Sequence, residues 1–222
     1  MKTMKRICCV LMFLPLVMTL VGLPFLPDQV PTHFGVHGTA DAWGSKYSIL
    51  LLPILSILMG GSLLGMSVYA QKQEKTGTNN AKLTLLTACI TLCIFCGITG
   101  FQIAAGMLGT QNLEELPVDM NQVIFTLLGI MLICLGNQMP KARKNTMIGL
   151  RTRSSLVNEA VWKKCQKFGG ITMMLSGAAM VVISFLTRGI SCFLWSMAAL
   201  IVQVPLALIY SWRAAKKDAQ QP

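Results

Sequence analysis

Long uncharged stretches alternate with short charged segments along the whole chain. The uncharged stretches cover residues 7–27, 47–71, 83–113, 120–140, 168–187 and 189–212. Each is long enough to cross a membrane, because an α-helix needs about 20 residues to span the hydrocarbon core. The pattern predicts an all-α, polytopic membrane protein with six transmembrane helices, folded as a single helical membrane domain over residues 1–222. We expect the third helix to end near Leu108, before a loop, and the last two to form a tight hairpin at Thr187–Gly189.

The composition supports a membrane protein and excludes two other classes. Hydrophobic residues make up 54% of the chain, whereas soluble domains contain about 45–50%. Charged residues make up 12%, about half of the usual quarter. Such a chain cannot cover itself with polar side chains, so a soluble globule is excluded, and so is a disordered chain.

The basic residues predict the orientation in the membrane. If the N-terminus is cytoplasmic, 17 of the 19 Lys and Arg residues fall in cytoplasmic segments, and only Lys46 and Arg188 fall outside. Basic residues are enriched on the cytoplasmic side of membrane proteins. The sequence therefore predicts cytoplasmic N- and C-termini. The net charge of +11 is then explained by contact with anionic membrane lipids, and we expect no direct nucleic acid binding.

The predicted spans offer little chemistry. No Asp, Glu, Lys, Arg or His lies deep in any of them, although such residues usually mark ion-coupled transport. Seven of the eight cysteines lie inside or at the edge of spans, where Cys is a small packing residue. No cofactor, metal site or catalytic constellation is predicted, so the chain is not expected to be an enzyme. Small and polar residues in the spans are expected to pack helices together or to form interhelical hydrogen bonds: Gly61, Gly65, Gln102, Asn121, Gln122 and Gln203.

The predicted extracytoplasmic loop covers residues 28–46. Its Pro and Gly residues favour turns over a helix. His33 and His37 are four residues apart, and Asp28 and Asp41 would complete a set of zinc ligands. That spacing aligns ligands only on a helix, so structural or pH-responsive histidines are favoured over a metal site.

The predicted cytoplasmic segment covers residues 136–170 and holds eight basic residues. We expect Ser155 to cap a short amphipathic helix that runs to about Phe168 and lies in the inner membrane interface. Such a segment is either a lipid-anchored connector or a docking surface for a cytoplasmic partner. The physical pattern alone favours the connector.

The same segment contains a recognisable motif. It reads Gly-Asn-x-Met-Pro-Lys-x-Arg-x-Asn from Gly136, and continues with Gly149-x-Arg-Thr, Asn158-Glu-x-x-Trp and Gly169-Gly. This motif resembles the signature of the SdpI-type bacterial immunity membrane proteins. The first loop is similar to a module that often precedes this signature, on the residues Pro27, Pro31, His33, Gly38, Asp41, Gly44 and Lys46. The chain departs from the family at Arg153-Ser-Ser, where Pro-Trp-Thr is usual, and at Gln166, where a His is common.

The resemblance implies a location in a bacterial cell membrane, and it also implies a function. It implies an integral membrane immunity protein that gives resistance to a secreted peptide toxin, and that also signals by recruiting a small cytoplasmic transcriptional repressor to the membrane. The implied recognition residues in the extracytoplasmic loop are Pro31, His33, Gly38, Asp41, Trp43 and Lys46. The implied docking residues in the cytoplasmic loop are Asn137, Met139, Pro140, Arg143, Asn145, Gly149, Arg151, Thr152, Asn158, Glu159 and Trp162. The alternative is a membrane transporter or exporter of a peptide or small hydrophobic molecule.

Overall fold

The structure of the protein is a computed structural model, which describes residues 1–35, 39–73, 79–110, 117–144 and 149–220. Within these ranges it contains six long helices: α1 (Lys2–Gly22), α2 (Leu51–Gln73), α3 (Asn79–Met107), α4 (Met120–Gln138), α5 (Glu159–Leu186) and α6 (Gly189–Ala219). All six are long and apolar enough to cross a membrane. The prediction of a polytopic all-α membrane protein is therefore confirmed. The third helix ends one residue before the predicted position, and only Thr187 and Arg188 separate the last two helices.

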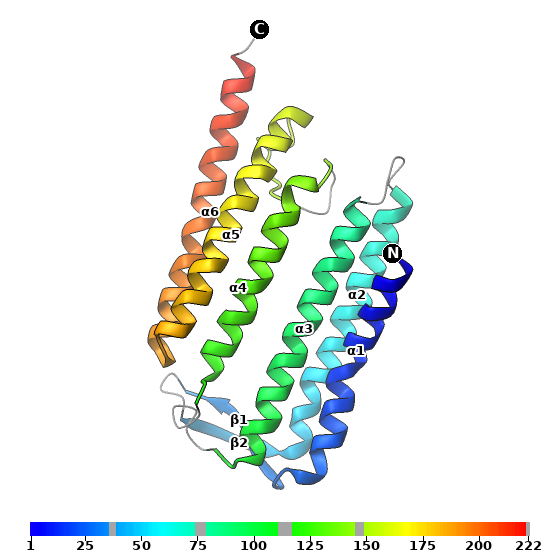
Figure 1. Ribbon diagram of the computed structural model, residues 1–222, viewed down its shortest axis with the longest axis vertical. Coiled ribbons are helices and arrows are strands. Elements are labelled where there is room, and N and C mark those ends of the chain that lie inside the picture. The colour runs from blue at the N-terminus through cyan, green and yellow to red at the C-terminus, as the bar shows by residue number, and fades with distance from the viewer. Residues whose placement is uncertain (36–38, 74–78, 111–116, 145–148, 221–222) are drawn as a thin grey trace.

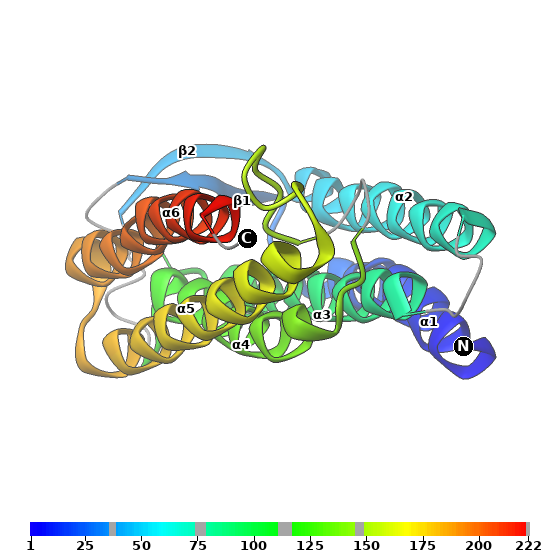
Figure 2. The same ribbon diagram turned by 90° about the horizontal axis from the view of Figure 1, so that it is seen from above.

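The helices form two groups that stand side by side. Helices α1, α2 and α3 pack on one another, as do α4, α5 and α6, and the groups meet along α3 and α4 (Figures 1 and 2). Both chain termini lie at one end of the bundle, which we call the terminal end (Figure 1). A two-stranded hairpin of β1 (Gln29–Phe34) and β2 (Ala40–Ser45) lies at the opposite end, the hairpin end.

Helices α4 and α5 share the most extensive contact in the bundle, and glycines make it possible. A Cβ on Gly136 would lie 2.6 Å from the carbonyl oxygen of Gly170, and one on Gly129 would lie 2.7 Å from that of Gly177. The two backbones are therefore in direct contact at two points, seven residues apart on each helix. Small residues allow this close approach in membrane helices, where packing rather than water drives association.

The structure corrects the prediction for Gly61 and Gly65. A Cβ on either glycine of α2 would meet no atom within 4 Å. Neither residue therefore packs against another helix of this chain. The spacing of the two glycines was the signal, but spacing alone does not say which face of a helix meets a neighbour.

The structure also corrects the prediction of a separate amphipathic helix from Ser155 to Phe168. Helix α5 begins at Glu159 and continues without a break to Leu186, and Asn158 caps it by accepting a hydrogen bond from the backbone N–H of Val161. Val161 and Cys165, which lie within that predicted helix, are buried in the protein. This part of α5 therefore belongs to the helix bundle, and the polar residues before it form turns.

Candidate functional site

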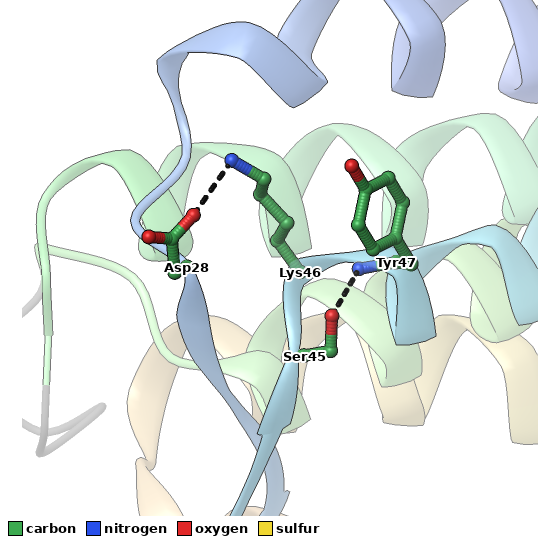
Figure 3. A network of polar contacts seen from close by, with 4 residues as sticks. All are labelled: Asp28, Ser45, Lys46 and Tyr47. Atoms are coloured by element: carbon green, nitrogen blue, oxygen red, sulfur yellow. Dashed lines mark hydrogen bonds and ion pairs between the residues drawn. The ribbon is translucent and has the colours of Figure 1, made fainter.

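Polar contacts close the base of the hairpin. Strands β1 and β2 are antiparallel, with Gln29 opposite Ser45 and Pro31 opposite Trp43. The Lys46 side chain donates a hydrogen bond to Asp28 Oδ1 at 2.9 Å, and the Lys46 backbone N–H donates to the Asp28 carbonyl at 3.0 Å. Beside this pair, Ser45 accepts a hydrogen bond from the backbone N–H of Tyr47 (Figure 3). These contacts fix the point where the chain leaves β2 and turns toward α2.

An apolar cluster anchors the inner side of the hairpin. Val30 is 3% exposed and packs with Leu26, Ile49 and Ile103. The first three belong to the hairpin and its flanking turns, and Ile103 belongs to α3. The loop was predicted to be built of turns and not to be helical. Its described residues contain no α-helix, but the two strands were not predicted. Their signal was the Val, Thr and Phe residues at alternating positions of 30–34.

The hairpin residues that the resemblance implies for recognition differ in position. Pro31 is buried, whereas His33, Asp41 and Trp43 are exposed. His33 Nδ1 and Asp41 Oδ1 lie 2.5 Å apart across the two strands. Gly38 lies outside the described residues, as does His37. Among the described residues, no group of three or more His, Cys, Asp or Glu side chains is arranged to hold a metal ion.

A cavity of about 440 Å³ lies under the hairpin, where the two helix groups open toward each other. Its volume falls in the range of about 300–1,000 Å³ that is usual for ligand sites. Its wall includes six consecutive residues, 30–35, from β1 and the position after it. Because strand side chains alternate between two faces, lining by consecutive residues means that the strand borders the cavity with its edge. Helices of both groups supply the rest of the wall, including Phe101 and Ala105 from α3 and Ile190 and Phe193 from α6.

Few polar groups face this largely apolar cavity. Gln102 lines it, and its Oε1 is buried without a hydrogen-bond partner among the described residues. Asn121 also lines it, but its amide donates to the Gly189 carbonyl at 3.1 Å. A buried polar atom without a partner is unusual. Gln102 therefore carries an unpaired acceptor beside the cavity.

Asp119 holds the rim of the cavity together. It is 3% exposed, and its carboxylate accepts hydrogen bonds from the backbone N–H groups of Gln122 at 2.9 Å and Gly189 at 2.7 Å. The carboxylate thus caps α4 and ties it to the start of α6. The Gln122 side chain adds two hydrogen bonds. Its Oε1 accepts from the Asp119 backbone N–H, and its Nε2 donates to the carbonyl of Ser184 on α5. Gln122 therefore makes the interhelical hydrogen bond that was predicted for it.

The cytoplasmic segment predicted over residues 136–170, which we call the signature segment, lies at the terminal end of the bundle. Trp162 is 1% exposed, and its Nε1 donates to the Ala142 carbonyl at 2.8 Å. Its ring packs with Leu83 of α3 and with Leu156. Trp162 thus connects the second helix group to the first and is not available at the surface.

A second buried side chain shapes the segment. Gln166 is fully buried; its Oε1 accepts from the Leu150 N–H at 2.9 Å and its Nε2 donates to the Leu150 carbonyl at 3.0 Å. Gly149 has a φ of +101°, and a Cβ there would lie 2.4 Å from Gln166 Oε1. The motif glycine is thus required both by its backbone conformation and by the close approach of Gln166.

Polar contacts also tie the segment to α6. Thr152 Oγ1 donates to Ser211 Oγ at 3.0 Å, and the Asn158 amide donates to the carboxylate of Asp218. Met139 is half-buried, and Asn145 lies outside the described residues. The residues of the predicted docking set that are exposed are Asn137, Pro140, Arg143, Arg151 and Glu159. The rest of the described set holds the segment in shape.

Sequence reasoning overlooked two of these structural roles. Asp119 was not singled out, although Asp-x-x-Gln before an apolar run signals a capped helix start. Gln166 was noted only as a departure from the family pattern. No local pattern identifies its partner, because Leu150 lies sixteen residues away.

Comparisons with known proteins identify similar sequences. Residues 141–211 match the model of the SdpI/YfhL protein family, and residues 10–57 match the model of a domain of unknown function, DUF1648. The chain is 25% identical to the immunity protein SdpI of Bacillus subtilis (strain 168) over 210 residues, which is 94% of this chain and 92% of that protein. No solved structure matches the chain significantly. The family match covers the signature segment with α5 and most of α6, and the relative aligns along nearly the whole chain, so we identify the chain as a multi-pass membrane protein related to the SdpI/YfhL protein family.

Proposed function

We propose that this protein protects the cell that makes it from a secreted, membrane-active peptide toxin, and that it binds the toxin at the hairpin end. The observation that carries the proposal is the cavity under β1, in a chain that aligns with an immunity protein along 94% of its length. That similarity also favours a non-enzymatic role. By the positive-inside rule the hairpin end faces the exterior, which is the side from which such a toxin arrives.

The cavity suits an apolar peptide segment in an extended conformation. Apolar side chains would enter between α3 and α6, and Gln102 would accept a hydrogen bond from the peptide. The edge of β1 that borders the cavity offers backbone groups for pairing, a common way to bind extended peptides. Pro31 lies on this strand, and it limits that pairing because it has no N–H to donate.

The signalling role that the resemblance implies would use the opposite end. We propose that the exposed polar and basic residues of the signature segment form the surface that recruits a cytoplasmic repressor. Trp162 and Gln166 would act indirectly, by holding that surface in one shape. Toxin binding can change recruitment only if the toxin binds one arrangement of the two helix groups more tightly than another. The Trp162–Leu83 contact between the groups is the contact that such a rearrangement would alter.

Survival of a toxin-sensitive strain tests the proposal. The strain is challenged with a series of secreted peptide toxins, with and without this protein, and membrane expression is verified. Selective protection against one peptide is the expected result. Failure against every peptide, at normal expression, would contradict an immunity role. The alternative function is transport, which requires a flux of substrate across the membrane in the absence of toxin. A leak assay in vesicles measures that flux.

Recruitment is tested separately. Arg143→Ala combined with Arg151→Ala changes the exposed surface, and Lys163→Ala combined with Lys164→Ala removes two equally exposed charges from α5 as a control. The first pair is expected to abolish membrane retention of a cytoplasmic partner and to leave toxin resistance intact. Loss of retention in both pairs would point to general charge attraction and would contradict the assigned surface.

A further inference from the structure

A second cavity lies at the terminal end, between the two helix groups. Its volume is about 300 Å³. Helices α1, α3 and α4 and the turn after α4 supply its wall, which consists of Met4, Lys82, Leu83, Leu86, Gln138 and Lys141. It shares no lining residue with the cavity under the hairpin. Two lysines from opposite helix groups therefore meet at one opening whose other side chains are mainly apolar.

The positive charge of this cavity is not neutralised by the described residues. Lys141 Nζ donates to Gln138 Oε1 at 3.0 Å, which is an uncharged partner. The Lys46–Asp28 ion pair and the His33–Asp41 contact both lie at the hairpin end, away from this cavity. Lys82 lies in the first turn of α3, which carries no acidic residue. The positive end of the helix dipole adds to its charge, so the cavity favours an anion.

The height of the cavity in the membrane indicates what kind of anion fits. The hydrophobic span of α3 begins at Asn80 and that of α4 ends at Lys141. Both lysines therefore lie at the ends of candidate spans, where a hydrocarbon core would meet the headgroup region. The neighbouring Leu83 and Leu86 continue from this level into the core. Basic cavities between transmembrane helices at this depth are typical binding sites of anionic lipid headgroups.

We propose that this cavity binds an anionic phospholipid, with its phosphate between Lys82 and Lys141 and its acyl chains along Met4 and Leu86. The lipid would fill the opening between the two helix groups at the end where the signature segment closes the bundle. It would thereby favour the arrangement in which the groups are joined there. The lipid site is separate from the proposed toxin site, because it lies at the opposite end of the bundle and shares no lining residue with it.

Trp162 provides a local reporter of this site, since its ring packs against the lining residue Leu83. Replacing the other three tryptophans with phenylalanine leaves it as the single fluorophore. The full chain is placed in phosphatidylcholine bilayers that contain increasing fractions of brominated phosphatidylglycerol, or of brominated phosphatidylcholine with the same acyl chains. Bromine quenches tryptophan fluorescence only at short range. We expect phosphatidylglycerol to quench Trp162 at a several-fold lower fraction.

Charge variants decide whether the two lysines cause this preference. Lys82→Gln and Lys141→Gln are each expected to weaken the preference about fivefold, the effect of about 1 kcal/mol per lysine near an anionic surface. The double variant should quench equally with both lipids. Replacing the same lysines with arginine should preserve the preference, and melting temperatures verify that each variant is folded. If the double variant does not fold, the two single variants carry the test.

Lys163→Gln combined with Lys164→Gln is the matched control, because it removes two exposed charges outside the cavity. It should leave the preference unchanged. Equal quenching by both lipids in the unmodified site would overturn the proposal. So would an equal loss in the control pair, which would indicate diffuse attraction to the surface. Relief of quenching by millimolar inorganic phosphate would show that the site takes free phosphate, and it would overturn the assignment to a lipid.

Discussion

Replacing Gly170 with alanine tests the direct backbone contact between α4 and α5. The new Cβ would lie 2.5 Å from the Gly136 carbonyl oxygen, whereas ordinary contact begins at 3.4 Å, so it is 0.9 Å too close. The obstacle is backbone, so relief requires the two helices to move apart. Overpacking of this kind costs about 1–3 kcal/mol. Alanine also favours a helix over glycine by about 1 kcal/mol, which offsets part of the cost.

Gly65→Ala provides the matched control on α2. It receives the same gain in helix propensity, but its Cβ would meet no atom within 4 Å. The difference in free energy of unfolding between Gly170→Ala and Gly65→Ala therefore isolates the contact, and it should be about 1–3 kcal/mol. Unfolding by dodecyl sulfate in mixed micelles, followed by far-UV circular dichroism, measures it. Equal stability of the two variants would refute the inference that α4 and α5 touch through their glycine backbones.

Three buried polar contacts lead to further predictions, each measured by the same unfolding assay. Trp162→Phe keeps most of the ring but leaves the Ala142 carbonyl without its donor, so a loss of about 1–3 kcal/mol is expected; unchanged stability would mean that this hydrogen bond does not form. Gln166→Leu leaves the Leu150 N–H unpaired, whereas the Leu150 carbonyl keeps its hydrogen bond from Ser155 Oγ, so a loss of about 1–3 kcal/mol is expected, a prediction that a neutral result would contradict. Asp119→Ala removes the cap of α4 and the tie to α6, with an expected loss of about 2–3 kcal/mol; a loss below about 0.5 kcal/mol would show that the carboxylate is dispensable.

The six spans could be predicted because membrane solvation acts on each segment separately. Every apolar run of about 20 residues must hydrogen-bond its own backbone, so length and charge alone identify a helix. The short link at Thr187 and Arg188 followed from the same reasoning. The helix boundary before α5 was wrong because its start depends on capping by Asn158 and on burial of Trp162 against Leu83. That contact joins residues far apart in the chain.

The candidate sites were predicted only in part. The two motif segments mark both ends of the bundle, and the sequence drew attention to Gln102 among the polar residues of the spans. The cavity itself was not foreseen, because its wall combines β1 with α3 and α6. The burial of Trp162 was not foreseen for a similar reason. A tryptophan among basic residues is typical of a membrane interface. In this fold, however, Trp162 is buried and its Nε1 donates to the backbone carbonyl of Ala142.

The most direct test of the proposed function is to fill the cavity under the hairpin with a larger side chain and to measure toxin resistance. Ile190 lines the cavity from α6, whereas Ile201 is 58% exposed on the same helix and does not line it. Each is replaced with tryptophan, and survival is measured over a concentration series of the peptide against which the unmodified protein protects. We predict that Ile190→Trp loses protection at normal expression and stability, and that Ile201→Trp retains it. Full protection by Ile190→Trp would contradict toxin recognition at this cavity.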